Sequence, residues 1–472
     1  MRYLLASVFF LYAYGNSFAQ DNVLATTGDA LYYTAGDSVE SRVILIGDGG
    51  ALVNGKAPVI EAVRKLIPLD KKSTVVFLGD NLYREGLPDD QASHYLTNRL
   101  VLDTQANLVK GTPSLAYFIP GNHDWMNGAA GGYAAIVRQQ RYIDAIAGKN
   151  VIFQPKDGCP GPVAVSVSEN VELVMMDSQW WLHSNDKPGI ESDCNQKTKE
   201  DIIAELEDIM GQNDKKLVIF ACHHPFRSNG IHGGYFRIKQ HIFPFTDLKK
   251  NLYIPLPGLG SIYPISRSVF GTPQDLKHPL YVDMVKQVEE VVRAHPHALF
   301  VAGHEHGLQY LKDSTEHFIV SGSGCKTTRV EGGGEAEFVQ QELGFVTLEV
   351  FKSKNVRLNF YTVKPDGSYV NWAYSQDILN FSTLPEIEDT LASQTQVLYE
   401  YRDSVLAPAS LLYDHATNFQ KFILGYNYRQ TWSQPVKFRE FNLTKEKGGF
   451  KILSRGGGKQ TKSLTLEDKN GE

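Results

Sequence analysis

The sequence predicts an α/β protein: a layered α-β-β-α sandwich of two mixed sheets flanked by helices, with a C-terminal α+β extension. Strand and helix patterns alternate over the first half of the chain, and a run of strand patterns follows. From this order we expect the later strands to build the second sheet. In addition, five apolar strand patterns end in polar residues, at the edge where open α/β sheets bind ligands.

The first half of the chain defines most of the expected elements. Apolar runs rich in Val, Ile, Leu and Phe predict buried strands, and apolar residues three or four positions apart predict helices. The helix expected at 198–210 begins with a capping pattern from Thr198 to Asp201. We expect strands at 42–47, 74–78, 114–119, 163–167, 171–176 and 216–222, and the other helices at 57–67, 91–109 and 133–147.

Periodicity is lost between Phe226 and His278, where Gly, Pro and aromatic residues dominate. A loop of this length inside a compact domain is usually functional, so we expect it to control access to a site. Beyond it we expect a helix at 282–292 and strands at 298–302, 318–320, 345–351 and 356–363.

These patterns place one domain at residues 38–378. Residues 379–472 are expected to form a connector and an incomplete β-rich module, with strand patterns at 450–453 and 463–466. Asn470-Gly471 is typical of a hairpin turn, and no returning strand follows it. We therefore expect the sequence to be cut inside this module.

The composition is that of a globular protein, with 42% hydrophobic and 21% charged residues. The net charge of −6 argues against a general nucleic-acid-binding protein, because no surplus of basic residues is present to neutralise phosphate backbones. A local basic patch remains compatible with this charge.

The first residues have the pattern of a secretory signal peptide. Arg2 precedes an apolar run from Leu4 to Tyr14, and the small-x-small sequence at 17–19 precedes Gln20. The apolar run is short for a membrane-spanning helix, although an uncleaved anchor is the alternative. We expect cleavage after residue 19 and a secreted, periplasmic or cell-surface protein.

The four cysteines agree with an oxidising compartment. Cys159 and Cys194 lie in polar surroundings and could form a disulfide, which would contribute about 3–4 kcal/mol through loop entropy. Cys222 ends an apolar run and is expected to be a buried thiol, and Cys325 could equally be buried. No pair has the spacing of a zinc finger.

The residues that follow the strand patterns are metal-ligand types. Each one alone has an ordinary structural explanation, such as a helix cap or a turn. Together they supply the carboxylates, imidazoles and amide oxygen that bind hard and borderline cations. They are Asp48, Asp80, Tyr83, Asn122, His123, His223, His304 and His306.

This ordered set resembles the calcineurin-like metallophosphoesterase superfamily over roughly residues 42–310. The family pattern is Asp-x-His, Gly-Asp, Gly-Asn-His-Asp/Glu, a His before x-Pro, and Gly-His-x-His. The first motif departs from it, because Gly50 occupies the position of the usual histidine. Tyr83, three residues after Asp80, compensates, and this exchange resembles the purple acid phosphatase branch.

The resemblance implies a dinuclear metal centre. One ion, Fe(III), would be held by Asp48, Asp80, Tyr83 and His306, because a phenolate is a hard anionic donor. The second, divalent ion (Fe, Zn or Mn) would be held by Asp80, Asn122, His223 and His304. His223 is preferred over His224 because Pro225 favours an extended conformation, which turns the two rings in opposite directions.

Two further histidines are candidate catalytic residues. The resemblance implies that His123 contacts phosphate and protonates the leaving group, with Asp124 fixing its tautomer. His232, in a glycine-containing loop, is a candidate substrate contact, and a flexible loop histidine is the alternative. We expect in-line attack of a metal-bound hydroxide on phosphorus, without a phosphoenzyme.

The leading hypothesis is therefore a secreted, acid phosphatase-like enzyme acting on a small phosphate monoester. The same ligands would serve a phosphodiesterase, nucleotidase or pyrophosphatase. A different class is a cell-surface assembly or binding protein whose phosphoesterase domain is secondary. Residues 381–472 resemble the region that joins such domains to outer-membrane barrel-like modules, which implies outer-membrane association.

Overall fold

The structure, a computed structural model, describes residues 38–382 except 147, 237, 247–250 and 270, and the backbone of 438–446, 449–456 and 461–467. The chain divides into two compact units between Ser382 and Thr383. The leader, the connector and the Asn470-Gly471 turn lie outside the described residues.

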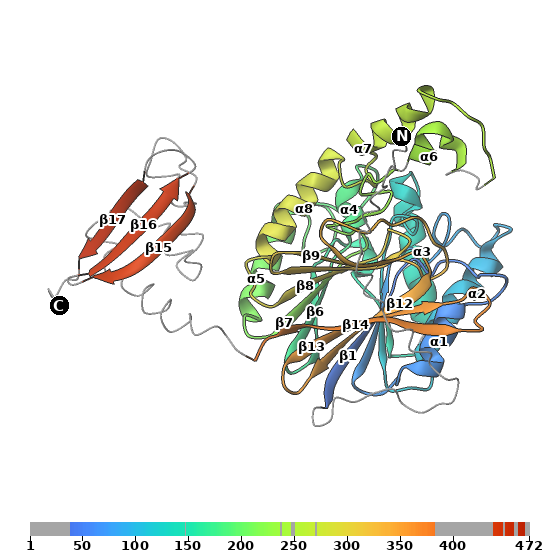
Figure 1. Cartoon of the computed structure of the whole chain (residues 1–472). Helices are drawn as coiled ribbons and strands as arrows, with labels where there is room; N and C mark the ends of the chain where they lie inside the picture. The colour runs from blue at the N-terminus through green and yellow to red at the C-terminus, as the bar shows by residue number, and fades with distance from the viewer. Residues whose placement is uncertain are drawn as a thin grey trace, which may run out of the picture. The chain divides into compact units, whose positions relative to one another are not determined.

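The first sheet has seven strands in the order β14-β13-β12-β1-β2-β3-β4 (Figure 1). Strands β1 to β4 run parallel, whereas β12, β13 and β14 add antiparallel on the other side of β1. The bounds are β1 Val39–Ile46, β2 Ser73–Leu78, β3 Leu115–Ile119, β4 Val151–Phe153, β12 Leu343–Phe351, β13 Asn355–Val363 and β14 Val370–Asn380.

The second sheet also has seven strands, in the order β11-β9-β10-β8-β7-β6-β5. Its central strands β6, β7, β8 and β10 run parallel, and the outer strands are antiparallel. The bounds are β5 Val163–Ser168, β6 Val171–Met175, β7 Leu217–Ala221, β8 Ala298–Ala302, β9 Leu308–Asp313, β10 Glu316–Ser321 and β11 Ala336–Gln340.

Helices cover the outer face of each sheet, which confirms the predicted α-β-β-α class (Figure 1). On β1, Ile44 and Ile46 pack towards one helix layer, while Val43 and Leu45 enter the core between the sheets, because strand side chains alternate. The helices are α1 Pro58–Leu66, α2 Tyr95–Ala106 and α3 Gly132–Ile146 on the first sheet, and α4 Ser178–Leu182, α5 Lys199–Gln212 and α8 Pro279–Val292 on the second.

The assignment of late strands to the second sheet is wrong. The chain enters the second sheet at β5 and returns to the first at β12, so both sheets contain early and late strands. The open edge of β1 accepts β12 antiparallel, a long-range pairing that local sequence does not encode. Strands β4, β9, β11 and β14 and helix α4 were not predicted, and the helix expected at 91–109 is shorter, with its last turn a 3-10 helix, η1 (Asn107–Val109).

The segment expected to be irregular between 226 and 278 contains short helices instead. These are α6 (Ile238–Ile242), the 3-10 turns η4 (Pro244–Thr246) and η5 (Leu259–Ser261), and α7 (Ile262–Val269). The helix α6 packs against η5 and α7, so they support one another. Interrupting Pro and Gly residues conceal their short helical patterns.

Several local predictions are confirmed. Thr198 and Asp201 form a reciprocal capping box at the start of α5. Cys159 and Cys194 are joined by a disulfide, and Cys222 is a buried free thiol. As a separate observation, which does not concern the predicted leader, the described residues contain no helix long and apolar enough to cross a membrane.

The second unit contains an antiparallel three-stranded sheet of β15 (Phe438–Glu446), β16 (Gly449–Gly456) and β17 (Thr461–Glu467). The sequence patterns at 450–453 and 463–466 fall within β16 and β17, whereas β15 was not predicted.

Candidate metal centre

The loops after β1, β2, β3, β7 and β8 meet at one edge of the sandwich. They bring together Asp48, Asp80, Asn122, His223 and His304, all buried. Close backbone approach explains the glycines between them: a Cβ on Gly121 would lie 2.3 Å from the Asp80 nitrogen, and one on Gly79 would lie 2.5 Å from His223 Nδ1.

His223, His304 and Asn122 form the first part of the cluster. His223 Nδ1 lies 2.8 Å from the Leu78 carbonyl oxygen, and His304 Nε2 lies 2.9 Å from that of Gln274. A carbonyl only accepts, so these nitrogens carry the protons, and His223 Nε2 and His304 Nδ1 keep their lone pairs. Both face Asn122 Oδ1, at 2.9 and 3.1 Å, which places three acceptors together.

Asp48, Tyr83 and His306 form the second part. The Tyr83 hydroxyl donates to Asp48 Oδ1 at 2.8 Å and lies 3.5 Å from His306 Nε2. His306 Nε2 is 3.3 Å from the same carboxylate oxygen. Burial, then the charges of Asp48 and Asp80, raise the pKa of Tyr83 well above its usual value, so the phenol is protonated in the protein alone.

Asp80 joins the two parts. Its Oδ1 lies 3.3 Å from His223 Nε2 and accepts the backbone N–H of His123 at 2.9 Å. Burial opposes its ionisation, but neighbouring positive charge, including that of Lys326, and the backbone N–H of His123 hold the pKa of Asp80 well below its usual range. Burial and the charge of Asp80 raise the pKa of Asp48 to about 7, as expected for two neighbouring carboxyl groups.

His224 lies within reach of the same centre, but its nitrogens are occupied. Its Nδ1 bonds the Ser178 hydroxyl at 2.8 Å, and its Nε2 bonds Gln274 Oε1 at 2.7 Å. Ligand atoms of His223, His224 and His304 nevertheless lie within 4.8 Å of one another. The hydrogen bonds of His224 favour a supporting position, in line with the sequence preference for His223.

His123 lies at the edge of the metal centre, and the predicted hydrogen bond between its ring and Asp124 is wrong. Its Nδ1 contacts the Arg84 carbonyl oxygen at 2.6 Å, so a backbone group fixes its tautomer. Asp124 instead accepts backbone N–H groups of Asn81, Leu82 and Gly121. The Asp124 carboxylate points back into the domain, and these hydrogen bonds fix the backbone of the loop that carries Asp80.

His232 reaches the centre from the segment after β7, with its ring centroid 4.1 Å from that of His304. Its Nδ1 lies 2.9 Å from Asp275 Oδ1, and its backbone N–H donates to Glu305. Asp275 also pairs with the Arg267 guanidinium. Sequence analysis missed Asp275 and Arg267, because neither belongs to a strand-end motif.

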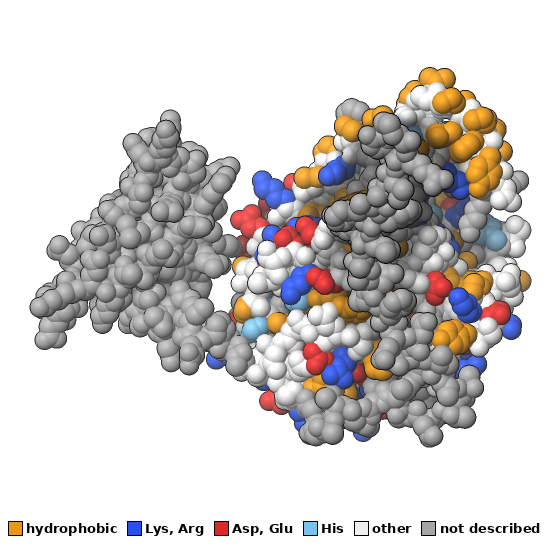
Figure 2. All heavy atoms as spheres, viewed as in Figure 1, with side chains coloured by type: hydrophobic (Ala, Val, Ile, Leu, Met, Phe, Trp, Pro, Cys, Tyr) orange, Lys and Arg blue, Asp and Glu red, His pale blue; other side chains and the backbone are white. Residues whose placement is uncertain are grey.

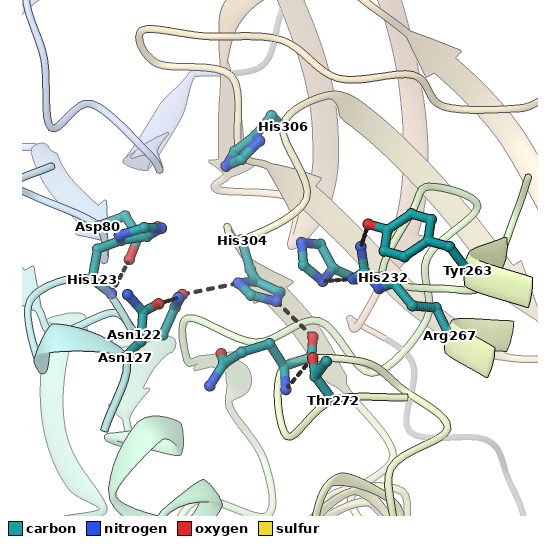
Figure 3. A pocket seen from close by; sticks show the side chains of 11 residues that line it. Asp80, Asn122, His123, Asn127, His232, Tyr263, Arg267, Thr272, His304 and His306 are labelled. Carbon is teal, nitrogen blue, oxygen red and sulfur yellow. Dashed lines mark hydrogen bonds and ion pairs between the residues drawn. The ribbon is translucent and has the colours of Figure 1, made fainter. Parts of the chain in front are cut away.

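A pocket of about 320 Å³ opens at this centre, and its lining includes Asp80, Asn122, His123, His232, His304 and His306. Figure 3 shows Asp80, Asn122 and His123 on one side of His304, and His232, Tyr263 and Arg267 on the other. Lys326, also missed, places its ammonium 3.4 Å from the centre of the Tyr83 ring. It follows a Gly-Ser-Gly sequence after β10, which was the available signal.

The donor set fits metal ions. Three acceptors meet at Asn122 Oδ1, and ligand atoms of Asp48, Asp80 and His223 lie within 4.8 Å of one another. Burying such groups without a compensating charge is costly, and a cation supplies that charge. All seven residues predicted as ligands are brought together, with His123 and His232 beside them.

Comparison with known proteins agrees with this site. The calcineurin-like phosphoesterase family matches residues 41–254. This part of the chain belongs to the family. As a calcineurin-like phosphoesterase it is a metal-dependent phosphoesterase, and its family binds two metal ions.

Solved structures similar to this calcineurin-like phosphoesterase have low sequence identity. GAP50, the anchor in the inner membrane complex of Plasmodium, has 16% identity and a TM-score of 0.42, covering 76% of this chain and 95% of its own. Purple acid phosphatase PPD1 from yellow lupin (Lupinus luteus) has 14% sequence identity and a TM-score of 0.43, and the match covers 75% of this chain and 57% of PPD1. PhoD has 10% sequence identity and a TM-score of 0.38, and the match covers 75% of this chain and 74% of PhoD. No curated protein sequence matches the chain.

Proposed function

We propose that this phosphoesterase is an exported, acid phosphatase-like enzyme that hydrolyses small phosphate monoesters. The observation that carries the proposal is the hydrogen bond of 2.8 Å between the Tyr83 hydroxyl and Asp48, beside the Asp80 carboxylate. It puts a phenolic oxygen among the metal-ligand candidates where the first motif of the chain lacks a histidine.

The donor sets suggest two different ions. Asp48, Asp80, Tyr83 and His306 would hold Fe(III), because three of the four donors are hard oxygens. Asp80, Asn122, His223 and His304 would hold a divalent ion, Fe, Zn or Mn. When bound, two cations polarise a phosphoryl group and make a water more acidic.

The chain's own residues would orient the substrate and handle the leaving group. The Arg84 carbonyl holds Nδ1 of His123, so Nε2 is the atom available to protonate a departing alcohol. Asp275 holds Nδ1 of His232, which leaves its Nε2 for a phosphate oxygen. Both histidines line the same pocket.

The disulfide supports an exported location, because disulfides persist in oxidising compartments. Together with the leader-like N-terminus, it favours a secreted, periplasmic or cell-surface enzyme. Association with an outer membrane through residues 379–472, and a surface-assembly role, stay secondary proposals.

The pocket volume favours a small substrate, and we expect no nucleic-acid partner. The test compares 4-nitrophenyl phosphate, bis(4-nitrophenyl) phosphate and pyrophosphate, using the full chain loaded with Fe and Zn. We expect kcat/KM for the monoester to exceed that for the diester by about 100-fold or more, because a second ester group removes a phosphate charge that the cations bind.

Asp80→Asn should abolish this activity and reduce bound metal, whereas Asp90→Asn, an exposed neighbour, should leave both unchanged. A preference for the diester or for pyrophosphate would reassign the substrate class. Full activity of Asp80→Asn would reject the proposed centre.

A further inference from the structure

The segment 235–269, between His232 and Asp275, exposes an unusual number of apolar side chains. Of the fifteen large hydrophobic residues that are exposed in the described part of the chain, nine lie in this segment. Figure 2 shows hydrophobic side chains gathered over α6 and α7, at the top of the view. We define the apolar patch as Ile238, Tyr253, Ile254, Leu259, Ile262, Ile265 and Val269.

The patch is one surface because its elements touch. The helix α6 packs against η5 and α7, and α7 packs against η5. On α7, Ile262, Ile265 and Val269 have the spacing of one helix face and are 52–63% exposed. Soluble monomers rarely expose a large contiguous apolar surface, so such a surface indicates an interaction site.

The charge of the segment indicates the kind of partner. In the sequence, positions 235–270 contain five basic residues and one acidic residue, a net charge of +4, whereas the whole chain has −6. Arg267 is paired with Asp275, and Lys239 lies 4.9 Å from the Tyr253 ring centre. The structure describes two of the five basic residues, Lys239 and Arg267. A segment whose sequence combines apolar and tyrosine residues with a surplus of basic residues is typical of those that lie in the interface of an anionic bilayer.

We propose that the apolar patch docks on a lipid surface rich in anionic headgroups. Docking holds the pocket close to that surface with α7 between them, because Tyr263 and Arg267 of the same helix line the pocket. Figure 3 shows both side chains reaching towards His232. Helical spacing places Ile262, Ile265 and Val269 on the other side of α7.

The first experiment measures binding of the full chain to vesicles of phosphatidylcholine, with and without phosphatidylglycerol, by flotation. The triple variant Ile262→Ser/Ile265→Ser/Val269→Ser should lower the affinity for anionic vesicles at least about tenfold, because apolar area no longer leaves water. The matched control Leu96→Ser/Leu100→Ser changes similarly exposed residues on α2, 72% and 52%, and should bind as the unchanged chain does.

The second experiment reads the patch directly, so that other membrane-binding regions of the chain do not mask it. Lipids brominated in the acyl chains should quench the added fluorescence of Ile265→Trp but not that of Leu100→Trp. Equal quenching of both, or of neither, would overturn the proposal. It would also be overturned if the triple variant only converted a dimer to a monomer, which would make a second copy the occupant of the patch.

Discussion

Nε2 of His223 and Nδ1 of His304 lie 3.2 Å apart, and the other nitrogen of each ring faces a backbone carbonyl. Two neutral imidazoles therefore direct lone pairs at each other, and the Asn122 oxygen completes a triangle of acceptors with them. Repulsion among acceptors is relieved by a cation, so the arrangement is built for a bound ion rather than for the protein alone.

This relationship predicts that metal stabilises the fold. Adding Zn²⁺ or Mn²⁺ to chelator-treated protein should raise Tm. At a metal concentration 100-fold above Kd, the free energy of unfolding should increase by about 2.7 kcal/mol. His304→Ala should lose most of the increase, whereas His94→Ala, at an exposed histidine, should keep it. An undiminished increase in His304→Ala, measured by calorimetry, would show that this ring does not hold the ion.

Tyr83 predicts a spectroscopic signature. Iron-loaded protein should absorb in the visible region through the Fe(III)–phenolate bond, and Tyr83→Phe should lose this band while keeping the ring beneath Lys326. Activity should fall about 10- to 100-fold, because Asp48 also loses a hydrogen-bond donor. Tyr95→Phe is the control, and a band that persists in Tyr83→Phe would assign the colour to another group.

Asp275 is predicted to be a positioning residue for His232. Asp275→Asn should lower kcat/KM about 10- to 100-fold, because the ring loses the acceptor that fixes its tautomer. In a His232→Asn background the Asp275→Asn change should lower kcat/KM less than about threefold, as expected for two residues that act together. Additive losses in this double-mutant cycle would mean that Asp275 supports the loop alone.

His317 predicts a pH-dependent stability outside the site. Burial, then the charge of Lys312, lowers its pKa to about 4, and the neutral ring contacts the Tyr310 hydroxyl at 2.8 Å. A depressed pKa contributes stability above pH 6.5 that is lost as the pH falls towards 4. When the pH is lowered from 7 to 4.5, the free energy of unfolding of the unchanged protein should fall by about 2 kcal/mol more than that of His317→Gln, as measured by urea unfolding. Parallel losses would contradict this assignment.

The strand-end residues were predictable because parallel strands that leave a sheet at the same edge bring the next residues together. Asp48, Asp80 and Asn122 follow β1, β2 and β3, which lie side by side in register. The sandwich then places His223 and His304, after β7 and β8, opposite them. Residue type and strand position were sufficient for this group.

Hydrogen-bond partners were harder to predict. Asp124 follows His123 in the sequence, yet its carboxylate turns to the backbone of Asn81 and Leu82, because buried N–H groups need acceptors. Asp275 and Lys326 reach the site from segments without a motif. Their positions depend on how α7 and the loop after β10 pack.

The sequence by itself determined most of the strands, the long helices, a candidate disulfide pair and the order of metal-ligand candidates, because these depend on local periodicity and residue chemistry. Tertiary structure decided that β12 returns to the first sheet, that the 226–278 segment folds into short helices, and that Asp275 supports His232. The reason is physical: edge pairing and side-chain hydrogen bonds depend on groups far apart in the chain, whose free energies are realised only when the layers pack.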